Sequence, residues 1–410
     1  MSSSYLSPAG TPISLAEIAA GLTAGLRGAD VERDLETTLR AISGRPHAWV
    51  LSSGRASMML LLQAMRDVEG AGKRNEVIIP AYTCYSVPAA IERAGLVPRL
   101  CDIDPRTLSY DADALARQPT ERALAIVSSN LYGLPNALPA IEAFARERGL
   151  FMLDDSAQAL GARIADRAVG GFGDVGLYSF DKGKNITTIQ GGAIVAARGP
   201  LGDAVAARCA KLPAPAPAET FSLAIKLIAY SVLLRPRLYA FVRRALAGSL
   251  GVTPYETTYP VARLGRSLCG IAARLAARLP ALTAARAANA ARYAQSLADL
   301  HAFELVQILP GAIPAWVRYP VLARDSTQRA ALIAALDAAG IGATASYPNA
   351  LPDVPEVARR AINPGDAFPG ARAVAARIVT LPTHPYCPPD LAGRVRGIVG
   401  SATRIAGAAA

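Results

Sequence analysis

The sequence has few of the residues that bind metals or build disulfide frameworks. Its 410 residues include three histidines, far apart, and five cysteines, none in a Cys-x-x-Cys pair. No spacing typical of a metal site occurs. The odd number of cysteines and the length of the chain argue against a disulfide framework and favour a reducing compartment. We therefore expect a cytoplasmic protein without a metal centre.

Long uncharged apolar runs are also lacking. The N-terminus has no basic segment followed by an apolar run, so we expect no signal peptide. The most hydrophobic stretch, 221–250, contains several Lys and Arg residues, and its longest uncharged run, 227–234, is too short to cross a bilayer. The whole chain is 52% hydrophobic and 18% charged. This composition argues against disorder and allows two domains, or one large domain with an appendage.

Acidic residues are fewer than basic ones, and the imbalance is local. The formal net charge is +11, and residues 221–295 contain Lys226 and ten arginines against one acid, Glu256. A basic block in one segment favours an anionic partner, such as a nucleotide diphosphate, a lipid phosphate or a membrane surface. Solvated faces of surface helices would explain the block equally well. Nothing in the pattern indicates a nucleic acid as the partner.

Short apolar strands alternate with helices through the first half of the chain. We expect strands at 49–51, 77–80, 97–101, 124–128 and 150–153, and helices at 56–65, 111–117 and 136–148. This alternation predicts an α/β domain with a mainly parallel sheet. Ligands bind beyond the carboxyl ends of the strands in such sheets. The turn 52–54 and the pair Asp154-Asp155 would both lie at that edge.

The pattern changes after residue 208. A Pro/Ala-rich segment, KLPAPAPAE, reads as a connecting loop, and helices follow over 221–250 and 264–300, broken at Pro236 and Pro280. Strand-like runs and helices from about 303 predict a smaller α+β unit. We therefore divide the chain into a large α/β domain (1–212), a basic, apolar helical insert (213–262), and connecting helices with a small C-terminal domain (263–410).

The run from Gly171 to Gly176 matches G-x-G-x-x-G, the pattern of a dinucleotide-binding turn. Such a turn must follow a strand and open a helix. Here a loop precedes the glycines and LYSF, a predicted strand, follows them. We therefore interpret these glycines as residues that permit tight turns.

A more specific series of motifs spans residues 153–194. It reads LDDSAQALG from 153, GDVG from 173, YSFDKGKNITT from 178 and GGAI from 191. Together with SSG (52–54), EVIIPA (76–81), CDIDP (101–105) and LPTHP (381–385), it resembles the DegT/DnrJ/StrS family of pyridoxal 5′-phosphate (PLP)-dependent sugar aminotransferases. The resemblance is close over 45–195, looser over 300–400 and poor over 212–290. It implies fold type I: a seven-stranded, mainly parallel sheet with helices on both faces, in a homodimer.

The resemblance assigns the two central roles. PLP forms an imine with a lysine whose amine must be partly unprotonated, and Lys184 occupies the family position. The nearby Lys182 reads better as an exposed loop residue. Asp155 would pair with the cofactor's ring nitrogen and keep it protonated, which stabilises a carbanion at the substrate carbon. Its other reading is an N-cap for the following residues, a part that suits Asp154 better.

The remaining cofactor contacts are also carried over from the family. Gln158 would pack at the hydroxyl side of the ring, and Ser179 would offer its hydroxyl to the phosphate. Gly54 and Arg55 would offer backbone N–H groups at a helix start. Arg55 replaces the usual Thr, so a hydroxyl contact is lost, although its guanidinium could add another.

Two features depart from the family pattern. Cys84 stands where the family often has an aromatic ring stacked on PLP, with Tyr82 and Tyr85 as neighbouring alternatives. The family segment that sends an Asn to the neighbouring subunit has no recognisable counterpart, and the nearest text is 259–264. His384 reads as structural.

The sequence thus predicts a PLP-dependent aminotransferase. It would move an amino group from an amino acid, glutamate by resemblance, to a nucleotide-linked keto-sugar for cell-surface polysaccharide or secondary-metabolite biosynthesis. One alternative is a PLP-dependent sugar dehydratase, but such family members replace the lysine with histidine. Another is a PLP-binding regulator without turnover. The segment 221–250 would dock on an anionic membrane, cover the site, or serve dimerisation.

Overall fold

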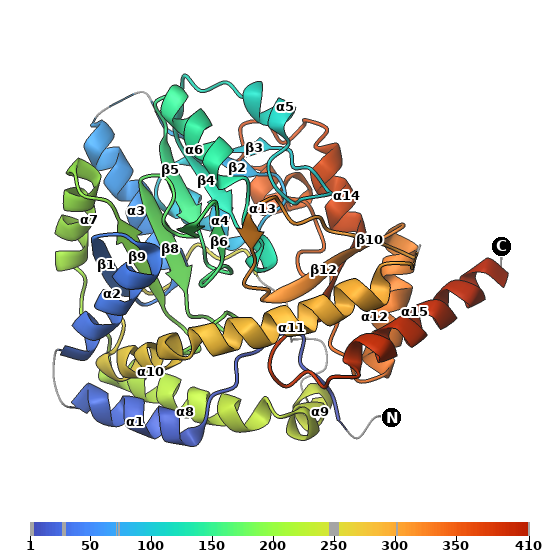
Figure 1. Cartoon of the computed structure of the whole chain (residues 1–410). Coiled ribbons are helices and arrows are strands. Elements are labelled where there is room, and N and C mark those ends of the chain that lie inside the picture. The colour runs from blue at the N-terminus through green and yellow to red at the C-terminus, as the bar shows by residue number, and fades with distance from the viewer. Residues whose placement is uncertain are drawn as a thin grey trace.

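The computed structural model describes residues 4–26, 30–70, 72, 74–245, 254–300 and 302–408. Its centre is a seven-stranded sheet with strand order β1-β9-β8-β5-β4-β2-β3 (Figure 1). Strand β9 runs antiparallel to both neighbours, and the other pairs are parallel. The strands are β1 (His47–Leu51), β2 (Glu76–Pro80), β3 (Val97–Cys101), β4 (Ala123–Ser129), β5 (Phe151–Asp155), β8 (Val175–Ser179) and β9 (Gly192–Ala196). The predicted mainly parallel sheet is confirmed.

Both faces of this sheet are buried. Ile79 and Leu153 belong to one apolar core, which also contains buried residues of α3 (Gly54–Glu69). Their neighbours Ile78 and Met152 belong to another core, which contains α6 (Leu138–Glu147). Because successive side chains of a strand point to opposite faces, strands covered on both sides are uniformly apolar. Helices lie on both faces, as predicted (Figure 1).

The other helices up to residue 210 connect or flank these strands. The N-terminal pair packs against α10 (Arg266–Ala277). These helices are α1 (Leu15–Leu26), α2 (Asp30–Ser43), α4 (Ser86–Arg93), α5 (Ala112–Ala116) and α7 (Pro200–Ala210).

The helices after residue 212 are interrupted at the two prolines where breaks were predicted. Helix α8 (Pro217–Leu233) meets α9 (Pro236–Ala245) at Pro236, and α10 meets α11 (Leu279–Leu297) beside Pro280. Figure 1 shows α11 running from α10 to the C-terminal part. Within the described ranges, no single helix has the length and apolar composition needed to cross a membrane. The bent pair α10 and α11 passes that test jointly, by length and composition alone, and many of its residues are buried.

The C-terminal part is a smaller α+β unit with its own core, as predicted. Its antiparallel sheet has the order β10-β12-β13. Leu6 packs in this core and pairs with Ile341, so the start of the chain lies against the C-terminal part. The elements are β10 (Phe303–Leu305), β12 (Arg318–Ala323), β13 (Ile378–Pro382), α12 (Ser326–Ala338), α13 (Pro355–Ala358), α14 (Pro369–Arg377) and α15 (Leu391–Ala408). A third small sheet contains β6 (Arg163–Ile164), β7 (Arg167–Ala168) and β11 (Ala312–Ile313).

The glycines at 171–176 lead into strand β8 and not into a helix, which confirms that they form no dinucleotide-binding turn. Gly173 has a φ of +63°, a conformation that favours glycine. Gly176 lies against backbone, since a Cβ added there would be 2.1 Å from the carbonyl oxygen of Gly170. These glycines allow the turn to pack tightly beside β5.

This contact predicts that Gly176→Ala destabilises the protein. Neither backbone segment can move without disturbing the sheet, so we expect a loss of about 1–3 kcal/mol in the free energy of unfolding. Urea denaturation measures it. Gly365→Ala is the control, because nothing lies within 4 Å of an added Cβ there. Equal stability of Gly176→Ala and wild type would contradict the packing described.

Candidate active site

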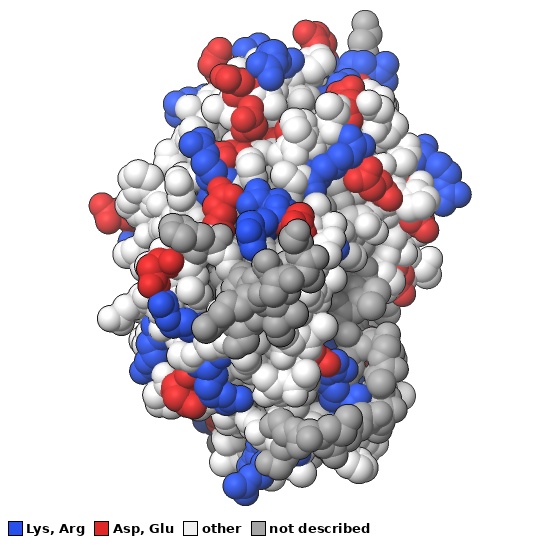
Figure 2. All heavy atoms as spheres, turned by 90° about the vertical axis from the view of Figure 1, so that its right-hand side faces the viewer, with Lys and Arg blue, Asp and Glu red and all other residues white. Residues whose placement is uncertain are grey.

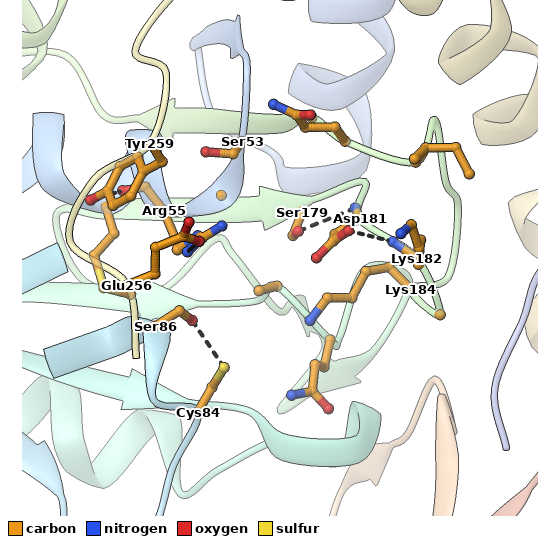
Figure 3. A pocket seen from close by; sticks show the side chains of 18 of the residues that line it. Ser53, Arg55, Cys84, Ser86, Ser179, Asp181, Lys182, Lys184, Glu256 and Tyr259 are labelled. Carbon is orange, nitrogen blue, oxygen red and sulfur yellow. Dashed lines mark hydrogen bonds and ion pairs between the residues drawn. The ribbon is translucent and has the colours of Figure 1, made fainter. Parts of the chain in front are cut away.

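A cavity of about 550 Å³ opens at the carboxyl edge of the sheet (Figure 3). It is bordered by the ends of β5 and β8, the start of α3 and the loop between β8 and β9. All seven residues assigned to the cofactor from the sequence line it: Gly54, Arg55, Cys84, Asp155, Gln158, Ser179 and Lys184. The fold therefore brings together residues that are up to 130 positions apart.

Lys184 is half-buried in the loop between β8 and β9, and its side chain extends into the cavity (Figure 3). Its backbone is held on both sides. The N–H donates to the carbonyl of Asp181 at 3.3 Å, and the carbonyl accepts from the hydroxyl of Thr11 at 2.6 Å. Lys182 also borders the cavity but is exposed, which fits its reading as a loop residue.

A buried cation braces this loop from behind. Arg286 of α11 is fully buried and donates to the hydroxyl of Thr11 at 3.2 Å and to the carbonyl of Val317 at 3.2 Å. Burial lowers the pKa of its guanidinium to about 10. Through Thr11, Arg286 connects the backbone of Lys184 to the start of β12. The sequence carried no signal of this brace, because its members are far apart along the chain.

Asp155 is the last residue of β5 and is buried. Its Oδ1 accepts the N–H of Ala157 at 3.1 Å, and its Oδ2 accepts the hydroxyl of Ser129 at 3.5 Å. Burial raises the pKa of this carboxyl, and the N–H of Ala157 and then the positive charge of Lys184 oppose that rise. The acid and the amine are thus close enough to interact electrostatically within one cavity.

Asp154 has a different role from the helix N-cap that the sequence suggested, because residues 156–161 form turns and not a helix. Its side chain is fully buried and accepts from the amide of Asn130 at 2.8 Å and the hydroxyl of Ser156 at 3.0 Å. It also accepts the N–H of Gly170 at 2.6 Å. Burial raises its pKa to about 6 against these bonds. Asp154 fastens the glycine turn to the end of β5.

A candidate anion site lies at the start of α3. Ser53 caps this helix by accepting the N–H of Ala56 at 3.1 Å. Gly54 lies directly against Ser179, since an added Cβ would be 3.0 Å from the Cβ of Ser179. Free N–H groups of a helix start and a hydroxyl therefore border the cavity side by side, an arrangement that suits a phosphate.

The guanidinium of Arg55 is engaged elsewhere. It forms an ion pair with Glu256 at 2.7 Å and lies over the ring of Tyr259, 5.0 Å from its centroid (Figure 3). Arg55 thereby holds the segment 254–260 beside the cavity and has its N–H, but not its charge, free for a phosphate. With the lysine, the acid and the anion site, these residues fit PLP.

The residues around the ring position differ in part from expectation. Cys84 lines the cavity, with its Sγ 2.9 Å from the hydroxyl of Ser86. Tyr82 and Tyr85 are buried outside the lining, so neither offers a ring face. Tyr347 lines the cavity instead, and its hydroxyl accepts the amide Nε2 of Gln158 at 3.0 Å.

Several lining residues were missed from the sequence. They come from α8 (Glu219, Leu223 and Lys226), from the segment 254–260, and from the C-terminal part (Val317, Arg318, Ser346 and Tyr347). None belongs to a recognisable motif. His384 is fully buried, with Nε2 2.9 Å from the carbonyl of Ser7, and burial lowers its pKa to about 4. Those contacts agree with a structural role.

Comparison with known proteins identifies the class. The model of the DegT/DnrJ/EryC1/StrS aminotransferase family matches residues 17–213 and 262–399. The chain belongs to this family. The segment between the two matched ranges includes α8 and α9.

Individual relatives are similar over part of their length. A UDP-N-acetyl-3-dehydro-alpha-D-glucosamine 3-aminotransferase of Acidithiobacillus ferrooxidans is 36% identical over 40% of this chain and 43% of its own. An L-glutamine:2-deoxy-scyllo-inosose aminotransferase of Micromonospora echinospora is 38% identical over 40% of this chain and 37% of its own. The matches thus span less than half of these curated relatives.

Solved structures match the fold over nearly the whole chain. The aminotransferase TlmJ of Streptoalloteichus hindustanus has a TM-score of 0.76 at 23% identity and covers 98% of this chain and 99% of its own. DesV of S. venezuelae, solved in complex with a ketimine intermediate, has a TM-score of 0.74 at 26% identity and covers 94% of each chain. The fold type I architecture is confirmed.

The two lysines of the loop give a direct test of the site. After loading with PLP and reduction with borohydride, wild type and Lys182→Ala should carry the cofactor mass on the peptide that contains Lys184. Lys184→Ala should carry none, because Lys184 supplies the amine that extends into the cavity. Peptide mass spectrometry makes the measurement. Cofactor fixed to another lysine in Lys184→Ala would refute the assignment.

Proposed function

We propose that this protein is a PLP-dependent aminotransferase that moves an amino group from an amino acid to a nucleotide-linked keto-sugar. The observation that carries the proposal is the joint position of Lys184, Asp155 and the Gly54–Ser179 anion site in one cavity. The names of the relatives support it, since they are aminotransferases acting on a UDP-linked sugar and on a cyclitol.

Each residue of the site has a defined task. PLP, when bound, supplies an aldehyde that accepts the amine and a ring that takes up electron density. Asp155 holds a proton at the ring nitrogen. Lys184 would act as general base and acid: it would take a proton from the substrate carbon and return it at C4′ of the cofactor. The N–H groups of Gly54 and Arg55 and the hydroxyl of Ser179 orient the phosphate.

Two alternatives from the sequence remain as rival proposals. A sugar dehydratase of this family would have histidine in place of Lys184. A regulator without turnover has some support, because one relative, 34% identical over 40% of this chain, is named a pleiotropic regulatory protein of Geobacillus stearothermophilus. The intact set of site residues favours the transferase. A regulator would not convert its cofactor when an amino acid is added.

The two half-reactions test the transferase directly. Glutamate or glutamine should convert the PLP form to the pyridoxamine form, and one keto-sugar of a nucleotide-linked panel should restore the first form. Absorbance follows both conversions, and Lys184→Ala should slow each by at least about 100-fold, because it removes the general base. A protein that loads PLP but responds to no amino donor would contradict the proposal.

We further propose a cytoplasmic homodimer that serves cell-surface polysaccharide or secondary-metabolite sugar biosynthesis. The family resemblance supports the dimer, and all five cysteines are free, as a reducing compartment favours.

We also propose that α8 and α9 rest on an anionic membrane. Phe221, Ile225 and Phe241 are 68%, 51% and 71% exposed. Exposed cations accompany them on these helices and in the turn between them: Lys226, Arg235 and Arg237. Apolar side chains beside cations are typical of helices that lie in a membrane interface. A second copy docked by two-fold symmetry on this surface would bring these cations face to face, which disfavours self-association here.

On the face shown in Figure 2, acidic and basic side chains lie side by side over the upper part. The helices α8 and α9 also lie in the segment that the family model leaves unmatched, so their sequence departs from the family pattern. Because Lys226 borders the cavity, a membrane-bound α8 would bring the site close to lipid headgroups.

Vesicle flotation tests the membrane contact. Wild type should float with phosphatidylglycerol vesicles and less with neutral phosphatidylcholine vesicles, since cations contribute to binding. Replacing Phe221, Ile225 and Phe241 with Ser should reduce flotation several-fold. A control replaces Ile313 and Ile362, which are 61% and 46% exposed elsewhere. Equal flotation of both variants, or a change only in oligomeric state, would refute the proposal.

A further inference from the structure

Arg318, the first residue of β12, lines the cavity without a counter-ion. Its Nη1 donates to the hydroxyls of Thr344 at 2.7 Å and Thr380 at 3.3 Å. Burial lowers the pKa of its guanidinium, and the groups that oppose this shift are tyrosines, Tyr347 first. Among the residues that the structure describes, no carboxylate forms an ion pair with it. Arg318 is half-buried, and partial removal of its charge from water favours an anion that binds beside it.

Some N–H groups of the Arg318 guanidinium form no hydrogen bond to protein. Of its five N–H groups, the bonds to protein use only those on Nη1, which leaves Nε and Nη2 for a ligand. The other cavity arginine, Arg55, is already paired with Glu256. Of the two arginines that line the cavity, Arg318 is therefore the one that forms no ion pair with a described residue.

Shared neighbours link Arg318 to the residues assigned to the cofactor. Tyr347, which is close enough to Arg318 to influence the pKa of its guanidinium, accepts a hydrogen bond from Gln158. The carbonyl of the preceding residue, Val317, accepts from Arg286, which also holds Thr11 against the backbone of Lys184. One brace thus positions both the lysine and the start of β12.

We propose that Arg318 binds the α-carboxylate of the amino donor. This inference rests on the proposed function. A donor must present its nitrogen where Lys184 presents its own, and its α-carboxylate is one carbon removed from the carbon that carries this nitrogen. A diphosphate is separated from the reacting carbon of a sugar by more bonds. Guanidinium and carboxylate also match as a two-pronged pair. Since glutamate and glutamine share this group, one arginine would serve either donor.

The test compares Arg318→Met with wild type, using 2-methylglutamate as a probe. This amino acid lacks the hydrogen that transamination removes, so absorbance titration of the bound cofactor reports binding alone. We expect Arg318→Met to bind it about 100-fold more weakly, the scale of losing one buried charged partner. The preference for glutamate over 4-aminobutyrate, which lacks an α-carboxylate, should fall by a similar factor. The half-reaction with keto-sugar should change less than about twofold.

Two further variants keep the test decisive. Arg324→Met, which removes an exposed arginine of the same part of the fold, should behave as wild type. Arg318→Lys keeps the positive charge but loses the two-pronged guanidinium, so it should bind the probe with intermediate affinity. It also provides a result if Arg318→Met does not fold.

Other outcomes would overturn the inference. Unchanged probe binding by Arg318→Met would do so, and so would a loss confined to the keto-sugar half-reaction, which would assign the anion to the diphosphate. Failure of the proposed function looks different: wild type would bind the probe more tightly than Arg318→Met, yet convert neither glutamate nor glutamine.

Discussion

The parallel pairing of β5 with β8 is the constraint on which the site depends. Asp155 pairs in register with Leu177, which brings the carboxyl ends of both strands to one edge. Because β9 returns antiparallel to β8, the loop between them, with Lys184, must lie at that same edge. A slip of one residue in this pairing would turn Asp155 to the opposite face of the sheet. The acid, the amine and Ser179 therefore meet through strand register.

Buried charge without ordinary partners recurs around this edge. Asp154 is satisfied by backbone N–H groups and polar side chains. Arg286 donates to carbonyls and hydroxyls through Nη1 and Nη2, and its buried Nε has no partner. These two groups fasten the turns on either side of the cavity, the glycine turn by Asp154 and the lysine loop by Arg286. Arg318 differs, because it lines the cavity, and its Nε and Nη2 are not used in hydrogen bonds to protein. Asp154 and Arg286 therefore stabilise the fold, whereas Arg318 is placed to bind a ligand.

The sequence predicted the strands, the helix that opens at the turn 52–54 and the cavity residues that belong to motifs. It succeeded there because strand periodicity is local and because the motif spacing reflects one continuous stretch of sheet. It failed at Asp154, where the N-cap reading required a helix that the chain replaces with turns. Tyr347 and Arg318 were not predicted as site residues. Tertiary packing of the C-terminal part places them in the cavity, and no short sequence motif indicates such packing. The helical insert and its break at Pro236 were predicted, and covering the site was one of three roles left open for the insert; α8 does line the cavity.

The central claim is that one cavity holds an amine and an acid on opposite ends of the same cofactor ring. The most direct measurement is the ¹⁵N NMR shift of PLP labelled at the ring nitrogen and bound to the protein. Wild type should show a protonated nitrogen across neutral pH, and Asp155→Ala an unprotonated one, while Lys184 still binds the cofactor. A ring nitrogen with the same protonation in both proteins would contradict the account.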